Sequence, residues 1–531
     1  MSDTPLSRRD LFARSRDIGG LATLATLLTG RSDAQGTDGV RNVYTSIGVR
    51  PFINARGTYT ILSGSTMLPE VRAAMDMAAR QYVHLDELTE AIGDRLASLT
   101  SAEWGLVTSG CAAALTHATA ACVAGGNPDL HVRVPDLRGF AKDEVVIPKH
   151  SRNVYDAAIR AVGVRAIEVT TLAELDAALG PRTAMVYVLA GPNADNSALP
   201  VAAMAPLTRP RGVPILVDAA AEILTIPNVH LQNGATLVAY SGGKCLRGPQ
   251  TAGLLLGRKD LVKAAWVHSA PHHGYARGMK VGKEEAIGML AAVEQWVRRD
   301  HDAEWRQWTA WLEEIAKRVK TVDGIGLTTE ITQPAGLSNR TPSLRITWDR
   351  AALAATGAFV ARTLCQTEPR SSLFPARGGD QGRTGVSITP DMMAAGDAAV
   401  VADRLHALLS TRTAPGATPS PSATSGIDLS GTWSVDVAYA ASEATHTLHL
   451  RQRGNTIDGS HLGNFVSREL TGTVDGRDVS LQSFYGEEHG DALNYGFAGT
   501  IEGDTMSGSL DMGEYLKATW RATRRERSTR R

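Results

Sequence analysis

Short apolar runs alternate with longer segments of helical periodicity between residues 42 and 257. Apolar runs of four to six residues are typical of strands that are buried on both faces of a sheet. The alternation therefore predicts an α/β domain in which a largely parallel sheet carries helices on both faces. The expected strands span 105–108, 144–147, 166–169, 184–189, 214–217 and 236–240, and the expected helices span 112–123, 155–162 and 172–179.

A single helical periodicity continues from Lys283 to Val319. It predicts a long helix that joins the α/β domain to a smaller domain, which extends to about residue 410 and has strand-like runs at 343–347 and 385–389. Tryptophans in such a helix more often fill a core or an interface than contact a substrate. We expect that role for Trp296, Trp305, Trp308 and Trp311.

The pattern changes after residue 410. Residues 411–426 are rich in Pro, Ser and Thr, a composition typical of a linker, and residues 526–531 form a basic tail. Between them, residues 427–525 predict an antiparallel meander that closes as a small all-β barrel or sandwich module. Its alternating apolar and polar runs span 429–433, 447–451, 470–474, 479–482, 497–501, 506–510 and 516–520.

Residues 1–34 predict a twin-arginine export signal. Arg8 and Arg9 precede an apolar stretch at 18–28, and Ser32-Asp33-Ala34 offers a small-residue cleavage site. The apolar stretch is too short to span a membrane, so we expect no stable membrane insertion. The mature chain would start near Gln35 in the periplasm or outside the cell. A cytosolic terminus with a chance Arg-Arg pair is the alternative.

The composition argues against a partner that is attracted by the net charge of the protein. The 531 residues include 55 Lys and Arg against 55 Asp and Glu, so no net field attracts nucleic acid or an anionic membrane. The four cysteines lack the spacing of metal ligands. His268, His272 and His273 lack carboxylate or cysteine partners at ligand spacing, and we therefore predict no metal site.

Lys244 is the first candidate for chemistry. It follows the strand run 236–240 and the turn Ser241-Gly242-Gly243, and a second apolar run ends at Gly257. An amine held in an apolar pocket is desolvated and can form a Schiff base. Asp218 ends the preceding strand run, and an acid at one strand end beside a lysine at the next predicts a pyridoxal phosphate site. Taken singly, each residue has an ordinary interpretation as a surface or turn residue.

The turn Ser109-Gly110-Cys111 is the candidate phosphate site. It joins the strand run 105–108 to a helix, and the free N–H groups and the dipole of a helix N-terminus attract phosphate. A tight strand-to-helix turn without a ligand is the alternative. The presence of Asp218 and Lys244 downstream favours phosphate binding.

These segments together are similar to a known enzyme family. The matching motifs are Asn54–Thr58, Thr108–Gly110, Val217–Ala220, Ser241–Lys244 and Arg277–Glu284. They resemble the selenocysteine-synthase-like branch of fold type I pyridoxal-phosphate enzymes, which includes seryl-tRNA selenium transferase and D-glucosaminate-6-phosphate ammonia-lyase. The resemblance covers about residues 42–410, and the lysine loop with Gly248-Pro249-Gln250 is its most specific part. It implies a large cofactor-binding domain within 35–282 and a linking helix with a small α+β domain at 283–410.

The resemblance also implies roles for the candidate residues. Lys244 would carry the cofactor aldehyde as a Schiff base and then move the substrate α-proton, and Asp218 would pair with the pyridine nitrogen. The cofactor phosphate would be bound by Ser109, Gly110 and Cys111, with Ser241 assisting from the lysine loop.

Five further residues are candidates for the cofactor or the substrate. His150 would stack on the cofactor ring as a catalytic residue, and Asn193 would reach the phenolic oxygen. Arg383 would bind the substrate carboxylate through its guanidinium fork. Arg277 and Lys280 would meet an anionic group, with a position at a subunit interface as one option. An ordinary loop or surface position is the alternative for each. The resemblance implies a homodimer or a larger homo-oligomer.

Selenium transfer to tRNA fits poorly, because the chain is predicted to be exported and has no basic excess. We therefore expect a lyase, with a transferase as the less favoured class. It would act at the α and β carbons of a small amino acid or amino-sugar acid and release ammonia by elimination. A racemase or an aldolase would use the same residues. A non-catalytic envelope protein that binds a ligand through the β module is a further alternative.

Overall fold

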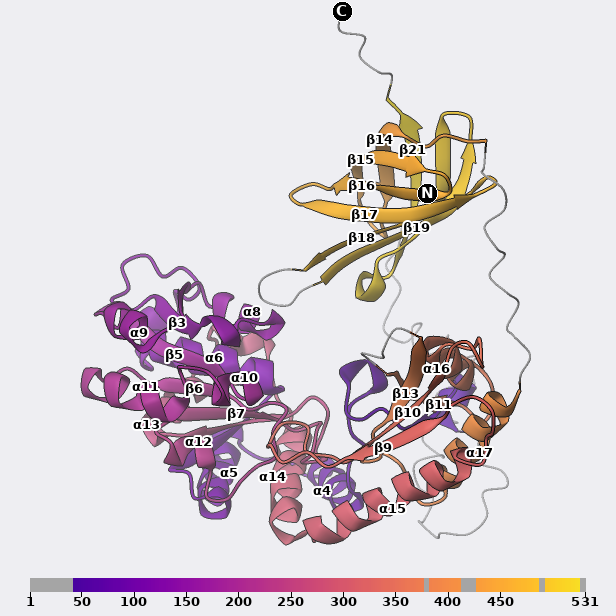
Figure 1. Cartoon of the computed structure of the whole chain (residues 1–531). Helices are drawn as coiled ribbons and strands as arrows, with labels where there is room; N and C mark the ends of the chain where they lie inside the picture. Colours follow the sequence, from indigo (N-terminus) through magenta and orange to yellow (C-terminus); the bar gives the residue numbers. More distant parts are fainter. Residues whose placement is uncertain (1–41, 377–381, 412–425, 487–491, 526–531) are drawn as a thin grey trace, which may run out of the picture.

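The computed structural model describes residues 42–376, 382–411, 426–486 and 492–525. Two lobes, coloured from indigo to orange in Figure 1, stand beside each other, and the C-terminal module is a separate barrel. The predicted export signal, most of the predicted linker and the basic tail lie outside the described residues. Within the described ranges, no helix is long and apolar enough to cross a membrane.

The large lobe is built on a seven-stranded sheet with the order β2-β8-β7-β6-β5-β3-β4. Strand β8 runs antiparallel to both of its neighbours, and the remaining neighbours pair in parallel. The α/β prediction is confirmed, and each expected strand lies within one or two residues of an observed one. The strands are β2 (Trp104–Thr108), β3 (Glu144–Pro148), β4 (Arg165–Val169), β5 (Thr183–Leu189), β6 (Ile215–Asp218), β7 (Leu237–Ser241) and β8 (Gly253–Gly257).

Two hydrophobic cores lie on opposite faces of this sheet. Helices α5 (Leu85–Thr100) and α14 (Lys283–Arg298) contribute to one core, together with α9 (Leu172–Ala178) and α11 (Val201–Thr208). Helices α6 (Cys111–Ala124) and α13 (Lys259–Trp266) contribute to the other. The helix expected at 155–162 is shorter: a 3-10 turn, η4 (Val154–Asp156), leads into α8 (Ala157–Arg160).

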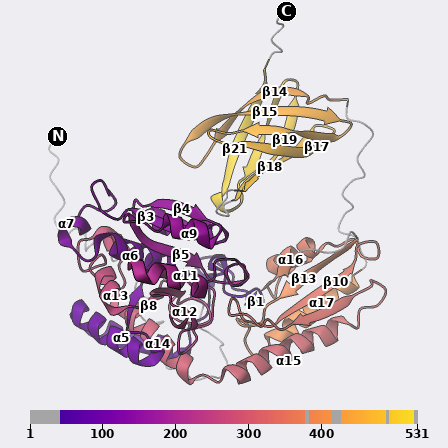
Figure 2. The ribbon, with the colours of Figure 1, turned by 60° about the vertical axis from the view of Figure 1, so that its left-hand side comes forward.

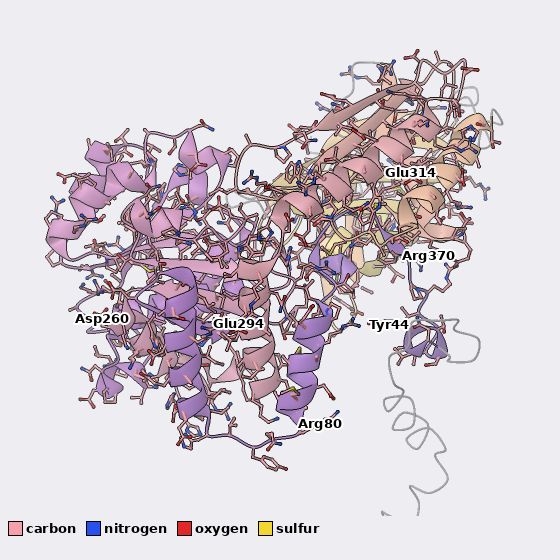
Figure 3. The ribbon with its side chains drawn as sticks, turned by 90° about the horizontal axis from the view of Figure 1, so that it is seen from below. Tyr44, Arg80, Asp260, Glu294, Glu314 and Arg370 are labelled. Atoms are coloured by element: carbon pink, nitrogen blue, oxygen red, sulfur yellow. The ribbon has the colours of Figure 1, made fainter. Side chains whose placement is uncertain are left out.

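The single long helix predicted over 283–319 is two helices. Helix α14 ends at Arg298, and α15 (His301–Val319) starts after Asp300, whose carboxylate accepts a hydrogen bond from the Ala303 N–H at 2.8 Å. This new N-cap is the physical reason for the break. Helix α14 packs on α4 (Pro69–Ala79) in the large lobe, whereas α15 packs in the small lobe. Figure 3 shows α14 with Glu294 and α15 with Glu314 on the two sides of the break.

The small lobe contains an antiparallel sheet with the order β12-β13-β10-β9. It also takes in the N-terminal segment, because β1 (Ile53–Asn54) pairs in parallel with β11 (Ser371–Ser372) and Ala55 is buried in the small-lobe core. The other elements of this lobe are β9 (Thr328–Thr332), β10 (Ser343–Asp349), β12 (Phe374–Pro375), β13 (Arg383–Ile388), α15, α16 (Gly357–Gln366) and α17 (Asp397–Ser410).

The C-terminal module is a closed eight-stranded antiparallel barrel, coloured from orange to yellow in Figures 1 and 2. The sequence pattern predicted the barrel but showed only seven strands. The pattern did not predict strand β16, because the inward positions of this strand include Gly459 and His461 and are not a continuous apolar series. The strands are β14 (Gly431–Ala438), β15 (Glu443–Arg453), β16 (Thr456–Leu462), β17 (Ser467–Asp475), β18 (Asp478–Gly486), β19 (Ala492–Glu502), β20 (Thr505–Asp511) and β21 (Lys517–Arg524).

Candidate functional site

The two key candidates meet at the carboxyl edge of the large-lobe sheet. Strands β6 and β7 are parallel neighbours, with Asp218 opposite Ala239, so the end of β6 lies beside the end of β7. Lys244 follows β7 after two glycines. Burial raises the pKa of the Asp218 carboxyl, and the positive charge of Lys244 is close enough to oppose that rise. Ligands of open α/β sheets bind at this edge.

Asp218 is buried and held by three donors. The Tyr187 hydroxyl donates to Oδ2 at 3.1 Å, and the Cys111 thiol and the Ala220 N–H donate to Oδ1 at 3.4 and 3.0 Å. Burial raises the pKa of Asp218, and these donors oppose the rise. The Asn153 amide in turn donates to the Tyr187 hydroxyl at 3.0 Å. The carboxyl group is therefore fixed in position and suited to bind a protonated ring nitrogen.

The lysine loop has its shape because two of its residues have no side chain. A Cβ on Gly242 would lie 2.5 Å from Met289 Sδ, and a Cβ on Gly243 would lie 2.2 Å from Gln250 Oε1. The backbone closes on itself, with the Gly248 N–H donating to the Gly242 carbonyl at 2.9 Å. This tight loop holds Lys244 half-buried at the wall of a cavity.

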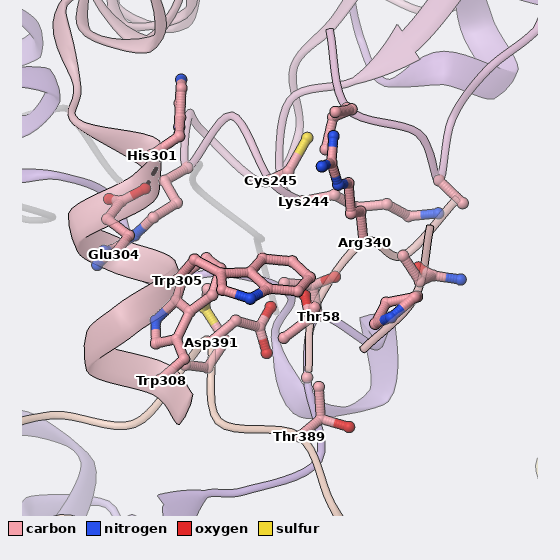
Figure 4. Close-up of a pocket in the computed structure, with 18 of the residues that line it drawn as sticks. Thr58, Lys244, Cys245, His301, Glu304, Trp305, Trp308, Arg340, Thr389 and Asp391 are labelled. Atoms are coloured by element: carbon pink, nitrogen blue, oxygen red, sulfur yellow. Dashed lines mark ion pairs between the residues drawn. The ribbon is translucent and has the colours of Figure 1, made fainter. Parts of the chain in front are cut away.

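The cavity has a volume of about 930 Å³ and lies between the lobes. Figure 4 shows residues of both lobes around it, with Lys244 and Cys245 from the lysine loop and Thr389 and Asp391 from the small lobe. Thr58 follows a turn in which Asn54 Oδ1 accepts the N–H groups of Arg56 and Gly57. The N-terminal motif thus contributes to the wall.

The predicted phosphate turn has a helix N-terminus without a side-chain cap. Gly110, with φ of +89°, is the N-cap of α6, and no side chain accepts the first-turn N–H groups. Those groups have no partner within a helix and so suit an anion. The Cys111 side chain points to Asp218 instead, so only its backbone is suited to phosphate. Ser241 is the half-buried last residue of β7.

His150 and Asn193 differ in their surroundings. His150 lies in a 3-10 turn directly after β3, and its Nε2 is buried without a hydrogen-bond partner among the described residues. Burial lowers the pKa of His150, which keeps the imidazole neutral. Asn193 is exposed in the short helix α10 (Pro192–Asp195) after β5. Neither His150 nor Asn193 lines the cavity. The environment thus supports His150 more than Asn193.

The three cations predicted for the substrate do not line the cavity. Arg383 donates to Asp349 at 2.6 Å and to acceptors on β9 and β10, so its guanidinium is engaged within the small-lobe sheet. Arg277 and Lys280 are exposed on a connection before α14. Four other arginines line the cavity, namely Arg56, Arg247, Arg299 and Arg340.

The aromatic wall of the cavity departs from the expectation for the tryptophans. Trp296 is buried, and its indole N–H donates to the Leu224 carbonyl at 2.8 Å, as a core residue would. Trp296 nevertheless also lines the cavity. Trp305 and Trp308 lie on the cavity wall as well (Figure 4). The break between α14 and α15 turns the start of α15 toward the cavity, which a single continuous helix could not do.

Asp391 was not identified from the sequence and is the second ionisable group of interest in the cavity. Its Oδ1 is buried without a hydrogen-bond partner in the described ranges. Burial raises its pKa to about 6, against the opposing effect of Arg247. The residue follows β13 in a short Pro-Asp-Met turn that has no recognisable motif. A carboxyl with this pKa can give up or take up a proton near neutral pH.

The arrangement fits pyridoxal phosphate. A buried carboxyl for the ring nitrogen, an amine on the cavity wall and an uncapped helix N-terminus lie at one edge of the sheet. The unpartnered Nε2 of His150 lies after β3, a strand of the same sheet. When bound, this cofactor would be held by Asp218, Lys244 and the first turn of α6.

Known proteins resemble this chain over part of its length. A profile of the aminotransferase class-V family matches residues 144–272. The chain is 31% identical over 293 residues to D-glucosaminate-6-phosphate ammonia lyase of Salmonella typhimurium, covering 54% of this chain and 77% of the relative. It is 35% identical over 298 residues to 5'-C-glycyluridine monooxygenase-decarboxylase of a Streptomyces species, covering 54% and 73%.

Two further comparisons agree with these. L-seryl-tRNA(Sec) selenium transferase of Moorella thermoacetica is 28% identical over 286 residues, which covers 47% of this chain and 55% of the relative. A solved structure of D-glucosaminate-6-phosphate ammonia-lyase matches with a TM-score of 0.62 at 28% identity, covering 70% of this chain and 99% of that chain. The fold and the cofactor expected from the motifs are confirmed.

The hydrogen bond from Tyr187 to Asp218 leads to a first prediction. Tyr187→Phe removes a donor that favours the ionised carboxyl, so the pKa of Asp218 should rise further and its attraction for a protonated ring nitrogen should weaken. We expect the dissociation constant for pyridoxal phosphate, measured by fluorescence titration, to increase about tenfold. Tyr240→Phe is the matched control, because Tyr240 is equally buried on β7 but bonds to Asn228. Equal affinities of the two variants would contradict this role.

Asp391 leads to a second prediction, on stability. Its folded-state pKa is about 6 against an ordinary value of 3.8, so the folded protein keeps an extra proton between these pH values. Raising the pH through this window therefore favours unfolding. We expect Asp391→Asn to be more stable than the wild type by about 3 kcal/mol at pH 8 but not at pH 4. Urea unfolding at both pH values tests this. Asp323→Asn, an exposed substitution, is the control, and a pH-independent difference would refute the argument.

Proposed function

This chain belongs to the selenocysteine-synthase-like branch of fold type I pyridoxal-phosphate enzymes, and we propose that it is a lyase that releases ammonia from an amino-sugar acid or a related β-hydroxy amino acid. One observation carries the proposal. Two proton-transfer groups, Lys244 and Asp391, line the same cavity from opposite lobes. An elimination needs such a pair, because one group takes the α-proton and another protonates the leaving hydroxyl.

The proposed roles follow from the position of each group. Bound pyridoxal phosphate would supply the electron sink that acidifies the α-proton of the substrate. Asp218 would hold the ring nitrogen protonated, and the Lys244 amine would take the α-proton. Asp391, in its protonated form, would donate a proton to the β-hydroxyl as it leaves as water. Loss of water followed by hydrolysis converts a 2-amino-3-hydroxy acid into a 2-keto-3-deoxy acid and ammonia.

The walls of the cavity support an extended, polyhydroxylated and anionic substrate. Its volume of about 930 Å³ exceeds what a three-carbon amino acid would fill. Arg56 has its Nε buried without a partner in the described ranges, and its guanidinium lies 4.0 Å from the centre of the Phe374 ring. We assign the substrate carboxylate to Arg56 because a guanidinium fork matches a carboxylate. Trp305 and Trp308 offer apolar faces to the C–H bonds of a sugar chain.

The family also contains other chemistries. The 35% identical relative is named a monooxygenase-decarboxylase, and a racemase or an aldolase would use Lys244 as well. These reactions do not require protonation of a leaving hydroxyl, so they give Asp391 no acid role. The products distinguish them: a lyase releases ammonia without oxygen uptake, carbon dioxide, aldehyde or an inverted amino acid.

Two variants test the elimination. With a 2-amino-3-hydroxy sugar acid as substrate, Lys244→Ala should abolish ammonia release, and Asp391→Asn should lower kcat by about 10²–10⁴-fold. Wild-type kcat/KM should fall as the pH rises above about 6, where Asp391 loses its proton. β-Chloroalanine is the control, because chloride leaves without a proton. Asp391→Asn should therefore keep wild-type activity on it, and an equal loss on both substrates would exclude the acid role.

We further propose that the enzyme is exported by the twin-arginine route and assembles as a homo-oligomer. The order of charged, apolar and small residues in 1–34 supports export, and the family resemblance supports assembly. Replacing Arg8 and Arg9 by lysine should retain the protein in the cytosolic fraction, while an unchanged distribution would remove the export proposal. Light scattering of the purified protein measures the oligomer, and a monomer would contradict assembly.

A further inference from the structure

The two ends of the C-terminal barrel differ in character. One end has tight two-residue turns such as 454–455, and its interior is apolar, with Trp433 and Val474 fully buried. The other end has the longer connections 439–442, 463–466 and 512–516. The buried polar side chains of the barrel lie toward this second end, which we call the open end. They are His446, His461, Arg468 and Ser483.

The two histidines lie in a linear chain of hydrogen bonds that runs from Tyr439 to Ser483. His446 Nδ1 lies 2.9 Å from His461 Nε2, and His461 Nδ1 lies 2.7 Å from Ser483 Oγ. His446 Nε2 is 3.4 Å from the Tyr439 hydroxyl. Burial, the neighbouring His446 and Arg468 lower the pKa of His461 to about 3, so the chain is uncharged at neutral pH. Each ring nitrogen of the two imidazoles has a hydrogen-bond partner, and the neutral rings cannot neutralise the charge of a neighbouring cation.

Arg468 is therefore a buried cation without a counter-charge in the described part of the barrel. It is 6% exposed and lies opposite His461 in the register of β16 and β17. Its Nη1 reaches only the Val466 carbonyl, at 3.4 Å, and its Nε is buried without a partner. The guanidinium carbon lies 4.7 Å from the centre of the Tyr495 ring. An unpaired buried charge is costly unless an anion balances it.

A cavity of about 420 Å³ lies at the same end, and Tyr495, Tyr439, Met512 and Leu516 are among its lining residues. Tyr495 thus contacts the cavity and also Arg468. The rim is apolar: every large hydrophobic side chain exposed in the described part of the barrel lies at this end, namely Leu462, Phe465, Phe484, Tyr515 and Leu516. The charged side chain in the cavity lining is that of Lys517, and Arg468 does not line the cavity but contacts its wall through Tyr495. A concave, largely apolar surface beside a buried cation is typical of a site for an anionic ligand.

We propose that the open end of the barrel binds a small organic acid, whose apolar body lies against Tyr439, Tyr495 and the rim and whose anionic group pairs with Arg468. Eight-stranded barrels have an interior wide enough for one small ligand. The site is separate from the cavity between the lobes. It does not depend on the lyase proposal, and it would give this chain a second binding function.

Calorimetric titration of the full chain with 2-naphthoate tests the proposal, with 2-naphthalenemethanol as the uncharged probe. The wild type should bind naphthoate more tightly than the alcohol. Arg468→Met should weaken naphthoate binding at least about tenfold and leave the alcohol unchanged, because only the charge-assisted contact is lost. Arg468→Lys, which keeps the charge, should restore part of the affinity.

Three further variants make the result specific. Arg451→Met, on the outside of the barrel and paired with Asp458, should bind naphthoate as the wild type does. Ser442→Trp, in an exposed turn at the cavity, should block both probes even if Arg468→Met fails to fold. Lys244→Ala should bind naphthoate normally, which separates this site from the catalytic cavity. The proposal is overturned if naphthoate does not bind the wild type, or if Arg468→Met and Arg451→Met bind it equally. Equal binding of both probes would instead indicate an apolar docking surface.

Discussion

The buried carboxyl of Asp218 is the constraint on which the rest of the catalytic unit depends. A negative charge at the end of a central strand is unfavourable in an apolar sheet, and here three donors from three separate segments stabilise it. Those donors fix the start of α6 and the middle of β5 relative to the end of β6. The donor from Cys111 therefore also holds the start of α6, the predicted phosphate turn, beside the end of β6.

The second organising feature is the division of the cavity between two lobes. The amine comes from the large lobe and the carboxyl of Asp391 from the small lobe, and the junction of α14 and α15 contributes the aromatic wall. Arg299, at this junction, donates to the Cys245 carbonyl at 3.2 Å and pairs with Glu304 at 2.8 Å. The junction is thus bonded directly to the lysine loop, so the position of one lobe depends on the other.

The sequence predicted what local chemistry determines. The apolar strands, the glycine-lysine loop and the uncapped turn at Gly110 each have a signal within a few residues. Contacts between distant segments place Trp305 on the cavity wall and keep Asp391 protonated. No local sequence pattern predicts either property. Arg383 has the residue type of a carboxylate ligand, but Asp349 on the neighbouring strand occupies its guanidinium. In the barrel, the inward His461 interrupted the apolar alternation, which concealed β16.

The pairing of β1 with β11 bears on how the chain folds during synthesis. Ile53 is among the first described residues to leave the ribosome, whereas its partner Ser371 emerges near the end of the two-lobed part. The small lobe cannot close until then, because its core combines Ala55 with residues as late in the chain as Leu409. The large lobe can form earlier, since its strands lie between Trp104 and Gly257. Completion of the nascent catalytic unit thus waits for a long-range contact, and slow contacts of this kind expose unpaired strand edges to aggregation.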